Sequence, residues 1–325
     1  MAVVPKFIGE RVKRREDPRL ITGTATYIDD LRLPGMLHAL VLRSPHAHAA
    51  INSIDLEAAR KAPGVVAVLT GADLKDKIGT LPCAAIADHK PFHPVLAKGK
   101  VRYVGEPVAV AVAADPYKAQ DALDLVEVDY DPLDAVVDPE KALEPGAPLI
   151  HETFGTNLVH RAEVSGLGVE EAMRKAHRII RFHVVNQRLA PVPIEPRGVL
   201  AQWHRASGQL ALWSSTQIPH LLRSALAGML NLAENRTRVI APEVGGGFGC
   251  KLNVYREEAL TAYLAIALGK PIKWIERRRE NLAATTHGRD LIAEVDVGVA
   301  SDGTILAMKA GLSATWVRIC NCSRP

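Results

Sequence analysis

The sequence predicts a protein of mixed helices and strands in two domains, and three observations lead to this prediction. The chain has 325 residues, and a domain typically holds roughly 100–200 residues. Hydrophobic residues make up 48% and charged residues 23% of the sequence, which is ordinary globular usage and disfavours disorder or a coiled coil. Short apolar runs of strand character also alternate along the chain with helix start and stop signals.

The first part of the chain contains two passages of strand, helix and strand. Apolar runs predict four strands here: 36–42, 65–69, 108–113 and 125–130. Two short helices are expected between them: 56–61 and 117–123. Asp115 followed by Pro116 is a typical helix start, because the carboxylate caps free N–H groups and proline fits the first helical turn. These β-α-β-like passages indicate one compact domain.

The second part follows residues 132–156, which are rich in proline, glycine and acidic residues and are typical of a linker. Helices are expected at 169–176, 219–230 and 260–268, and strands at 178–187, 210–214, 272–275, 291–299 and 304–309. Leucine, tyrosine and alanine in 260–268 recur at helical spacing and predict one apolar face. Asp302-Gly303 predicts a hairpin between the last two strands.

Charge and cysteine usage disfavour several classes of protein. The net charge is +4, and the densest basic run, Arg277 to Arg279, is followed at once by Glu280, so no nucleic-acid surface is expected. No apolar stretch approaches the ~20 residues of a membrane span, and the start has no secretory signal. The cysteines lack the spacing of a disulfide framework, and we expect a cytoplasmic, reducing setting.

The stretch Gly245-Gly246-Gly247-Phe248-Gly249 is the most informative motif. Glycines let the backbone approach a bound group closely, and successive N–H groups can bind an anion or an oxo ligand. The phosphate-binding P-loop pattern fails, because Cys250 stands where glycine is needed and Leu252 where serine or threonine is needed. The dinucleotide fingerprint fails at Cys250 too. A tight turn without a ligand stays open as an alternative.

Other polar residues have both a functional and a structural interpretation. Gln217 ends a strand in a run of small polar residues and offers a donor and an acceptor. Arg188, Glu195 and Arg197 lie in a proline-rich, extended segment and could bind an acidic group, but a structural Arg–Glu pairing is favoured. Cys250 is interpreted as a small buried thiol.

Two pairs of side chains look superficially like metal ligands. They are His46 with His48 and Cys320 with Cys322. Each lacks the second ligand pair of a structural zinc site, so no zinc is expected.

With these motifs in place, the sequence resembles the molybdopterin-binding large subunits of the molybdenum hydroxylases, the family of xanthine dehydrogenase, aldehyde oxidase and aerobic carbon monoxide dehydrogenase. The motifs that carry the resemblance occur in family order, and they are Glu16–Gly23, Arg43–His48, Val104–Val108, Glu195–Gly198, Ser215–Gln217 and Gly245–Gly249. Their number and spacing make the resemblance specific.

The resemblance implies an α+β fold with an α/β hammerhead domain at 19–131 and a partial molybdopterin-binding domain at 157–316. Residues 1–18 would be an extension, 132–156 the linker, and 317–325 a tail that departs from the family pattern. Gln217 would lie beside the oxo face of molybdenum, with Phe248 near it. Gly246, Gly247, Phe248 and Gly249 would border the cofactor.

The resemblance further implies a molybdenum-dependent oxidoreductase that hydroxylates its substrate with water as oxygen donor. The cofactor would be molybdenum-molybdopterin, in the cytosine dinucleotide form. Iron–sulfur clusters and FAD would sit on small and medium partner subunits, since no cysteine run here could hold a cluster. Purine-oxidising relatives carry glutamate after the lysine of this motif. Leu252 follows Lys251 here, which favours aldehyde, carbon monoxide or N-heterocycle substrates.

Family chains are more than twice as long, and the base glutamate would lie beyond residue 325. The catalytic residues are therefore unknown, and we expect the chain to be inactive alone. Two alternatives are a split enzyme completed by a second chain and a non-catalytic docking subunit that keeps the hammerhead surface. An apolar patch awaiting the missing part is expected at Leu260–Leu268 or Leu291–Ala310.

Overall fold

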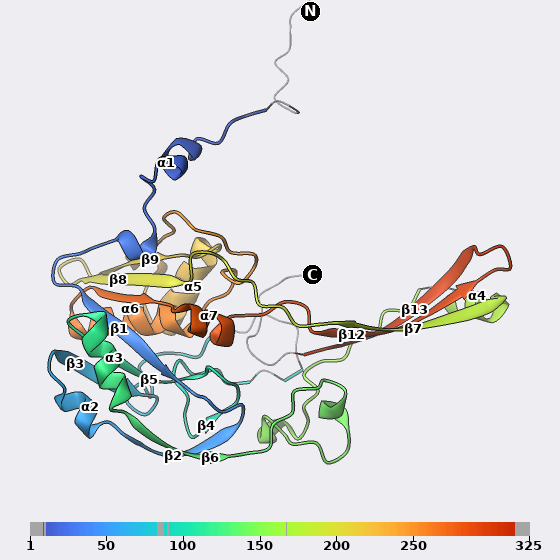
Figure 1. Ribbon diagram of the computed structural model, residues 1–325, viewed down its shortest axis with the longest axis horizontal. Coiled ribbons are helices and arrows are strands. Elements are labelled where there is room, and N and C mark those ends of the chain that lie inside the picture. Colours follow the sequence, from blue (N-terminus) through green and yellow to red (C-terminus); the bar gives the residue numbers. More distant parts are fainter. Residues whose placement is uncertain (1–8, 10, 83–87, 90, 167, 316–325) are drawn as a thin grey trace, which may run out of the picture.

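The computed structural model describes residues 9, 11–82, 88–89, 91–166 and 168–315. These residues form a body, built around a seven-stranded sheet, and a long arm carried by a separate three-stranded sheet (Figure 1). Cys83, Cys320, Cys322 and the divergent tail 317–325 lie outside the described residues. No described helix has the length and apolar character needed to cross a membrane.

The large sheet joins the two parts of the chain. Its strands are, in order, β10 (Thr237–Ile240), β9 (Gln209–Ser214), β8 (Gly198–His204), β11 (Ile272–Ile275), β1 (Leu37–Arg43), β5 (Pro107–Ala113) and β3 (Val65–Thr70). β1 pairs in parallel with β11, so strands from before and after the expected linker belong to one sheet. The domain boundaries themselves stay a prediction. Most neighbouring strands are antiparallel, as in the predicted α+β class.

The two β-α-β-like passages of the first part have different outcomes. The strands predicted at 36–42 and 65–69 share the large sheet and run parallel, but β5 lies between them. The strands predicted at 108–113 and 125–130 lie in different sheets, so the second passage is wrong in its pairing. β2 (Ala49–Asp55) and β6 (Glu127–Pro132) flank helices α2 (Glu57–Lys61) and α3 (Pro116–Asp124) in sequence, but they pair with each other and with β4 (Lys100–Val101) in another sheet. The strands on the two sides of each helix thus lie in different sheets. Hydrophobic periodicity identifies a strand but not its partner, which explains the error.

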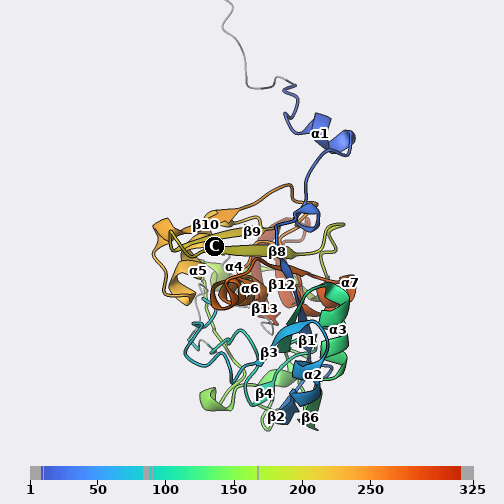
Figure 2. The ribbon, with the colours of Figure 1, turned by 90° about the vertical axis from the view of Figure 1, so that its left-hand side faces the viewer.

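Helix α6 (Arg256–Leu268) lies at the centre of the body, against β8, β9 and β11. Figure 2 shows it end-on below β8 and β9, with α5 (Pro219–Met229) beside it. The helix is buried on more than the one apolar face predicted for it, because the charged residues of its first turn are buried as well. Leu260 and Leu264 are 2% and 0% exposed, so the patch expected at 260–268 is wrong.

The sequence patterns did not predict several elements. Besides β2, β4, β8 and β10 these are α1 (Asp17–Ile21), α7 (Arg278–Ala284) and the short 3-10 helices at 28–30, 141–143, 152–154 and 234–236. β8 continues directly from the proline-rich segment, which obscured its start.

The arm consists of β7 (Arg178–Asn186), β12 (Leu291–Val299) and β13 (Ile305–Ala314), with β12 in the middle. The two last strands form the predicted hairpin around Asp302-Gly303. Helix α4 (Val169–Lys175) packs on this sheet at its outer end (Figure 1). Large hydrophobic side chains of the arm are exposed, which confirms the patch expected within 291–310.

Candidate cofactor site

The glycine segment, residues 245–249, connects β10 to α6 and turns sharply. Gly246 and Gly249 have φ angles of +93° and +88°, which glycine adopts without a steric penalty. Phe248 has a φ of +51°, an unfavourable conformation for a residue with a side chain. The residue is 77% exposed. Strained backbone and an exposed aromatic ring often mark a binding site.

Gln217 lies against this segment. A Cβ atom added at Gly247 would stand 2.4 Å from Gln217 Oε1, so only glycine leaves room for the amide. The Gln217 N–H donates to the carbonyl oxygen of Lys251 at 2.9 Å, which fixes the loop after β9 to the end of the glycine segment. The structure thus brings together the two segments that the sequence singled out.

The glycine segment offers unpaired donors. The N–H groups of Gly246, Gly247, Phe248 and Gly249 donate to no other described residue. The segment is exposed or half-buried along this stretch. Backbone N–H groups that lack a protein partner are strong donors for water or a bound group. Such a row can hold an anionic or oxo-bearing ligand.

Glu195 and Lys251 hold the glycine segment from behind. Glu195 Oε2 accepts from the Gly245 N–H and from Lys251 Nζ, both at 2.8 Å. The Lys251 side chain is completely buried, and Glu195 Oε1 is buried with no partner among the described residues. The expected Arg–Glu pairing is therefore wrong for Glu195, whose cation is a lysine. Glu195 and Lys251 are too far apart in the sequence for their spacing to predict the pair.

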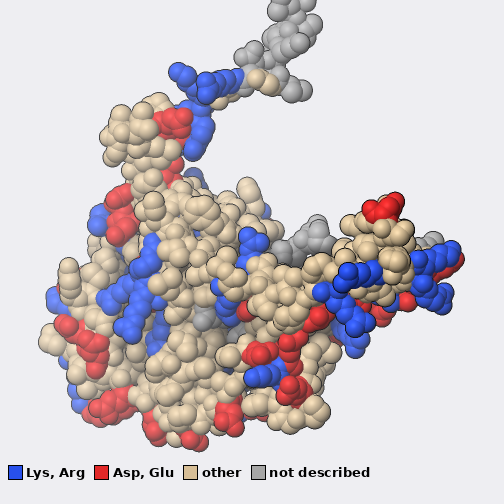
Figure 3. Space-filling model, turned by 45° about the vertical axis from the view of Figure 1, so that its right-hand side comes forward, with Lys and Arg blue, Asp and Glu red and all other residues tan. Residues whose placement is uncertain are grey.

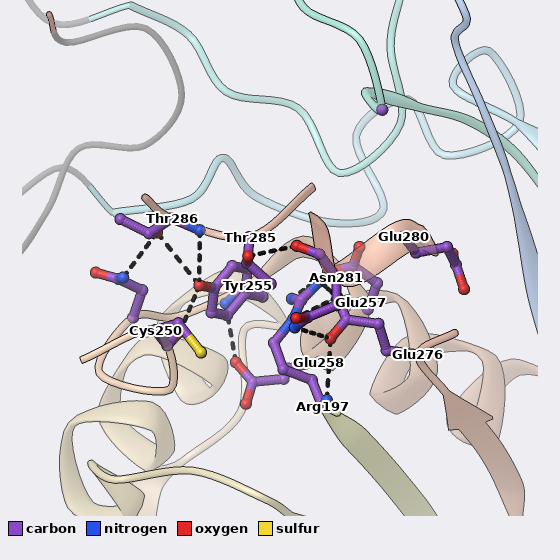
Figure 4. A network of polar contacts seen from close by, with 12 residues as sticks. Arg197, Cys250, Tyr255, Glu257, Glu258, Glu276, Glu280, Asn281, Thr285 and Thr286 are labelled. Atoms are coloured by element: carbon purple, nitrogen blue, oxygen red, sulfur yellow. Dashed lines mark hydrogen bonds and ion pairs between the residues drawn. The ribbon is translucent and has the colours of Figure 1, made fainter. Parts of the chain in front are cut away.

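Arg197 lies deeper in the body and is not available to a ligand. Its guanidinium donates to Glu276 Oε1 at 2.6 Å and to Glu257 Oε2 at 3.0 Å, and it stacks 3.7 Å from the centre of the Tyr255 ring (Figure 4). Arg43 of β1 donates to Glu257 and Glu280 from the other side. For Arg197, the structural pairing with glutamate is confirmed. The network joins β1, α6 and α7 to the residue before β8 and the residue after β11.

Two adjacent glutamates in this network have pKa values shifted in opposite directions. Burial acts to raise the pKa of Glu257, but Arg197 and Arg43 outweigh it and lower the pKa to about 2. Burial raises the pKa of Glu258 to about 7, because hydrogen bonds from the Tyr255 N–H and the Ser214 hydroxyl offset it only in part. Glu257 is charged at neutral pH, whereas Glu258 titrates there.

The remaining candidates have ordinary partners. Cys250 is fully buried, and burial raises the pKa of its thiol, as expected for a small buried cysteine. His48 Nδ1 lies 2.9 Å from the Asp134 carbonyl oxygen. Within the described ranges, no group of three or more metal-binding side chains comes together. Arg188 donates to Asp290 at 3.3 Å. Leu252, after the buried lysine, is 42% exposed.

Two family models match the chain. The a/b hammerhead domain of aldehyde oxidase and xanthine dehydrogenase matches residues 22–134. The molybdopterin cofactor-binding domain matches residues 150–315. Together they include every strand of the seven-stranded sheet and of the arm.

Individual proteins agree with these matches. The carbon monoxide dehydrogenase large chain of Afipia carboxidovorans is 38% identical over 98% of this chain and 40% of its own length. The solved quinoline 2-oxidoreductase of Pseudomonas putida 86 is 38% identical, with a TM-score of 0.88 over 96% of this chain and 40% of that one. The nicotinate dehydrogenase large molybdopterin subunit of Eubacterium barkeri is 31% identical over 94% of this chain and 69% of its own length.

The chain spans about 40% of the length of the first two relatives. The match to the third covers more than two thirds of a family protein. The resemblance and the fold class expected from the sequence are confirmed. The chain belongs to the molybdenum hydroxylase family of xanthine dehydrogenase, aldehyde oxidase and carbon monoxide dehydrogenase, and it carries the hammerhead and molybdopterin-binding domains of their large subunits.

Proposed function

We propose that this chain forms one wall of the molybdenum cofactor site in a large hydroxylase subunit. Gln217 and the stretch Gly246, Gly247, Phe248 and Gly249 are the cofactor-binding residues of this proposal. The observation that carries it is the contact of Gly247 with the Gln217 amide, within a stretch of four backbone N–H groups that donate to no other described residue. The match to a molybdopterin-binding domain supports the choice of ligand.

The described residues fit this cofactor chemically. Molybdopterin carries a phosphate and an anionic metal–oxo centre, which are acceptors for backbone N–H groups. Gly247 leaves space for the Gln217 amide, and that amide adds one donor and one acceptor beside the row. When bound, the cofactor supplies oxidative hydroxylation with water as oxygen donor. The protein wall positions it and keeps Gln217 oriented.

We further propose that the chain does not catalyse this reaction alone. None of the residues assigned to the wall has a carboxylate that could act as a base, and Glu195 behind the glycine segment is bound to Lys251. The relatives contain a large portion that this chain does not cover, and we assign the base to that portion. Electrons would leave through an iron–sulfur small subunit and an FAD-binding medium subunit.

A second chain that completes the site is the alternative with a specific observation behind it. The nicotinate dehydrogenase large molybdopterin subunit is itself short enough for this chain to match 69% of it. A short molybdopterin subunit thus occurs in this family. A docking subunit without cofactor is the third possibility, and it predicts binding of partner subunits with no molybdenum.

The experiment is co-expression of the full chain with the portion of the Afipia carbon monoxide dehydrogenase large chain that it does not span. Molybdenum and pterin content are measured in the purified complex, and the nucleotide released by acid identifies the cytosine dinucleotide form. Gly247→Ala is expected to push Gln217 aside and to lower the molybdenum content at least fivefold, with little loss of stability.

Gly228→Ala is the matched control, because a Cβ atom in that position of α5 meets no atom within 4 Å. It should bind as much molybdenum as the parent chain. Unchanged molybdenum content in both Gly247→Ala and Gln217→Ala would refute the proposed wall. Partner subunits bound without any molybdenum would favour the docking alternative.

A further inference from the structure

One face of the arm is apolar along its middle. Strand register determines which side chains share a face, since Val295 lies opposite Phe182 on one side and Ala310 on the other. Side chains of this face are Ile180, Phe182 and Val184 from β7, Ala293, Val295 and Val297 from β12, and Met308, Ala310 and Leu312 from β13. We refer to these residues as the apolar arm face. Arg178 and Asn186 lie on the same side at the two ends of β7, and the side chains between them are apolar.

The opposite face of the arm carries its charged side chains together with apolar ones such as Ile179, Val185 and Ile292, and we refer to it as the polar face. Its ion pairs join His183 to Glu294 and Arg181 to Asp296 across neighbouring strands. Helix α4 packs on this polar face, because Met173 lies beneath Gly298 and Glu170 pairs with Lys309. The helix therefore does not cover the apolar arm face.

The apolar arm face stays open in the described part of the chain. Phe182, Met308 and Leu312 are 47%, 61% and 69% exposed. Figure 3 shows how far the arm projects from the body, with charged side chains gathered at its outer end. Sheets normally turn their apolar face to a core, and contiguous exposed apolar patches mark interaction surfaces. This face is therefore built to be covered by another polypeptide.

We infer that the apolar arm face docks the portion of the large subunit that this chain does not span, an inference that rests on the proposed function. The occupant is identified by three observations. The arm lies inside the matched molybdopterin-binding domain, and the relatives carry a further portion of more than half their length. β13 also returns the chain to the body end of the arm, where Ala314 pairs with Leu291.

The character of the face agrees with this occupant. Its only charged neighbour on the same side of the described sheet is Arg178 at one end, so binding energy over the apolar arm face comes from apolar burial. In a relative with one long chain, the covering portion is tethered, and its effective concentration is high. A second copy of this chain is the competing occupant, and the test separates the two.

The test measures affinity between the full chain and the separately expressed complementary portion of the Afipia carbon monoxide dehydrogenase large chain. Leu312→Asp places a charge on the apolar arm face and should weaken binding at least tenfold. Ser313→Asp adds the same charge one residue further, on the polar face, and should change affinity less than twofold. Phe182→Asp repeats the first substitution on another strand.

The far-ultraviolet circular dichroism of each isolated variant shows whether it is folded. Equal affinity of the parent chain and the two apolar-face variants would overturn the inference. So would a dimer of the parent chain that these variants dissociate without any change in binding of the complementary portion. Docking without molybdenum would instead refute the proposed function and leave the docking surface standing.

Discussion

The body buries charged side chains, whereas the arm exposes apolar ones. In the body, Arg197, Glu257 and Glu276 have side chains at most 5% exposed, and each has a partner of opposite charge. In the arm, Leu312 and other apolar side chains face solvent. These three charged residues and the arm all lie within the matched molybdopterin-binding domain. The difference indicates that the body folds on its own contacts, whereas the arm is shaped for a partner.

The largest expected effect is in the body, from removal of Arg197. Arg197→Met leaves Glu257 and Glu276 buried with fewer cations, and breaking a buried pair typically costs about 3–5 kcal/mol. Urea unfolding followed by circular dichroism measures this loss. Arg223→Met breaks the exposed pair with Glu234 and should cost less than about 0.5 kcal/mol. Equal losses in the two variants would contradict the view that the network stabilises the body.

A second effect in the body depends on pH and comes from Glu258. Its folded-state pKa of about 7 lies above the ordinary 4.5, so the folded protein binds more protons between these values. Its contribution to stability is complete below pH 4.5 and is lost as pH rises to 7, by about 3 kcal/mol. Glu258→Gln should remove this decline, as measured by urea unfolding across pH 4 to 8.

Glu257, in the same helix, changes the free energy of unfolding with pH in the opposite direction. Its folded-state pKa of about 2 is below the ordinary value, so its contribution is present above pH 4.5 and is lost as pH falls toward 2. Glu257→Gln should therefore flatten the acid side of the profile and leave the decline above pH 4.5 in place. If both variants altered the same side of the profile, the assignment of the two carboxyl groups would be wrong.

Local pattern predicted most elements of the body, but it did not predict their pairing. Asp115 and Pro116 correctly identified the start of α3, where Asp115 accepts from the Lys118 N–H at 2.9 Å. The parallel pairing of β1 with β11 joins residues more than 230 positions apart, and no local signal encodes it. The burial of charged residues in α6 could not be predicted from local sequence either, because their partners come from other elements.

The candidate site shows the same limit. The glycine run alone was compatible with a ligand loop or with a tight turn, and only the family resemblance connected it to Gln217. The structure adds why that connection exists, since the Gln217 amide occupies the space of a Gly247 side chain. The Glu195–Lys251 pair behind the segment was missed, because a charge pair far apart in sequence leaves no spacing to read.

The smallest expected effect is in the arm. Replacing one leucine by alanine in the body and one in the arm tests the difference in burial between the two regions. Leu212→Ala in β9 removes a fully buried side chain and should cost about 2–5 kcal/mol. Leu312→Ala in β13 removes one that is 69% exposed, and it should change the free energy of unfolding by less than about 0.5 kcal/mol. Binding of a hydrophobic dye should fall only in the second variant. A cost above about 2 kcal/mol at Leu312 would mean that the isolated chain already covers the apolar arm face, and the arm would then need no partner.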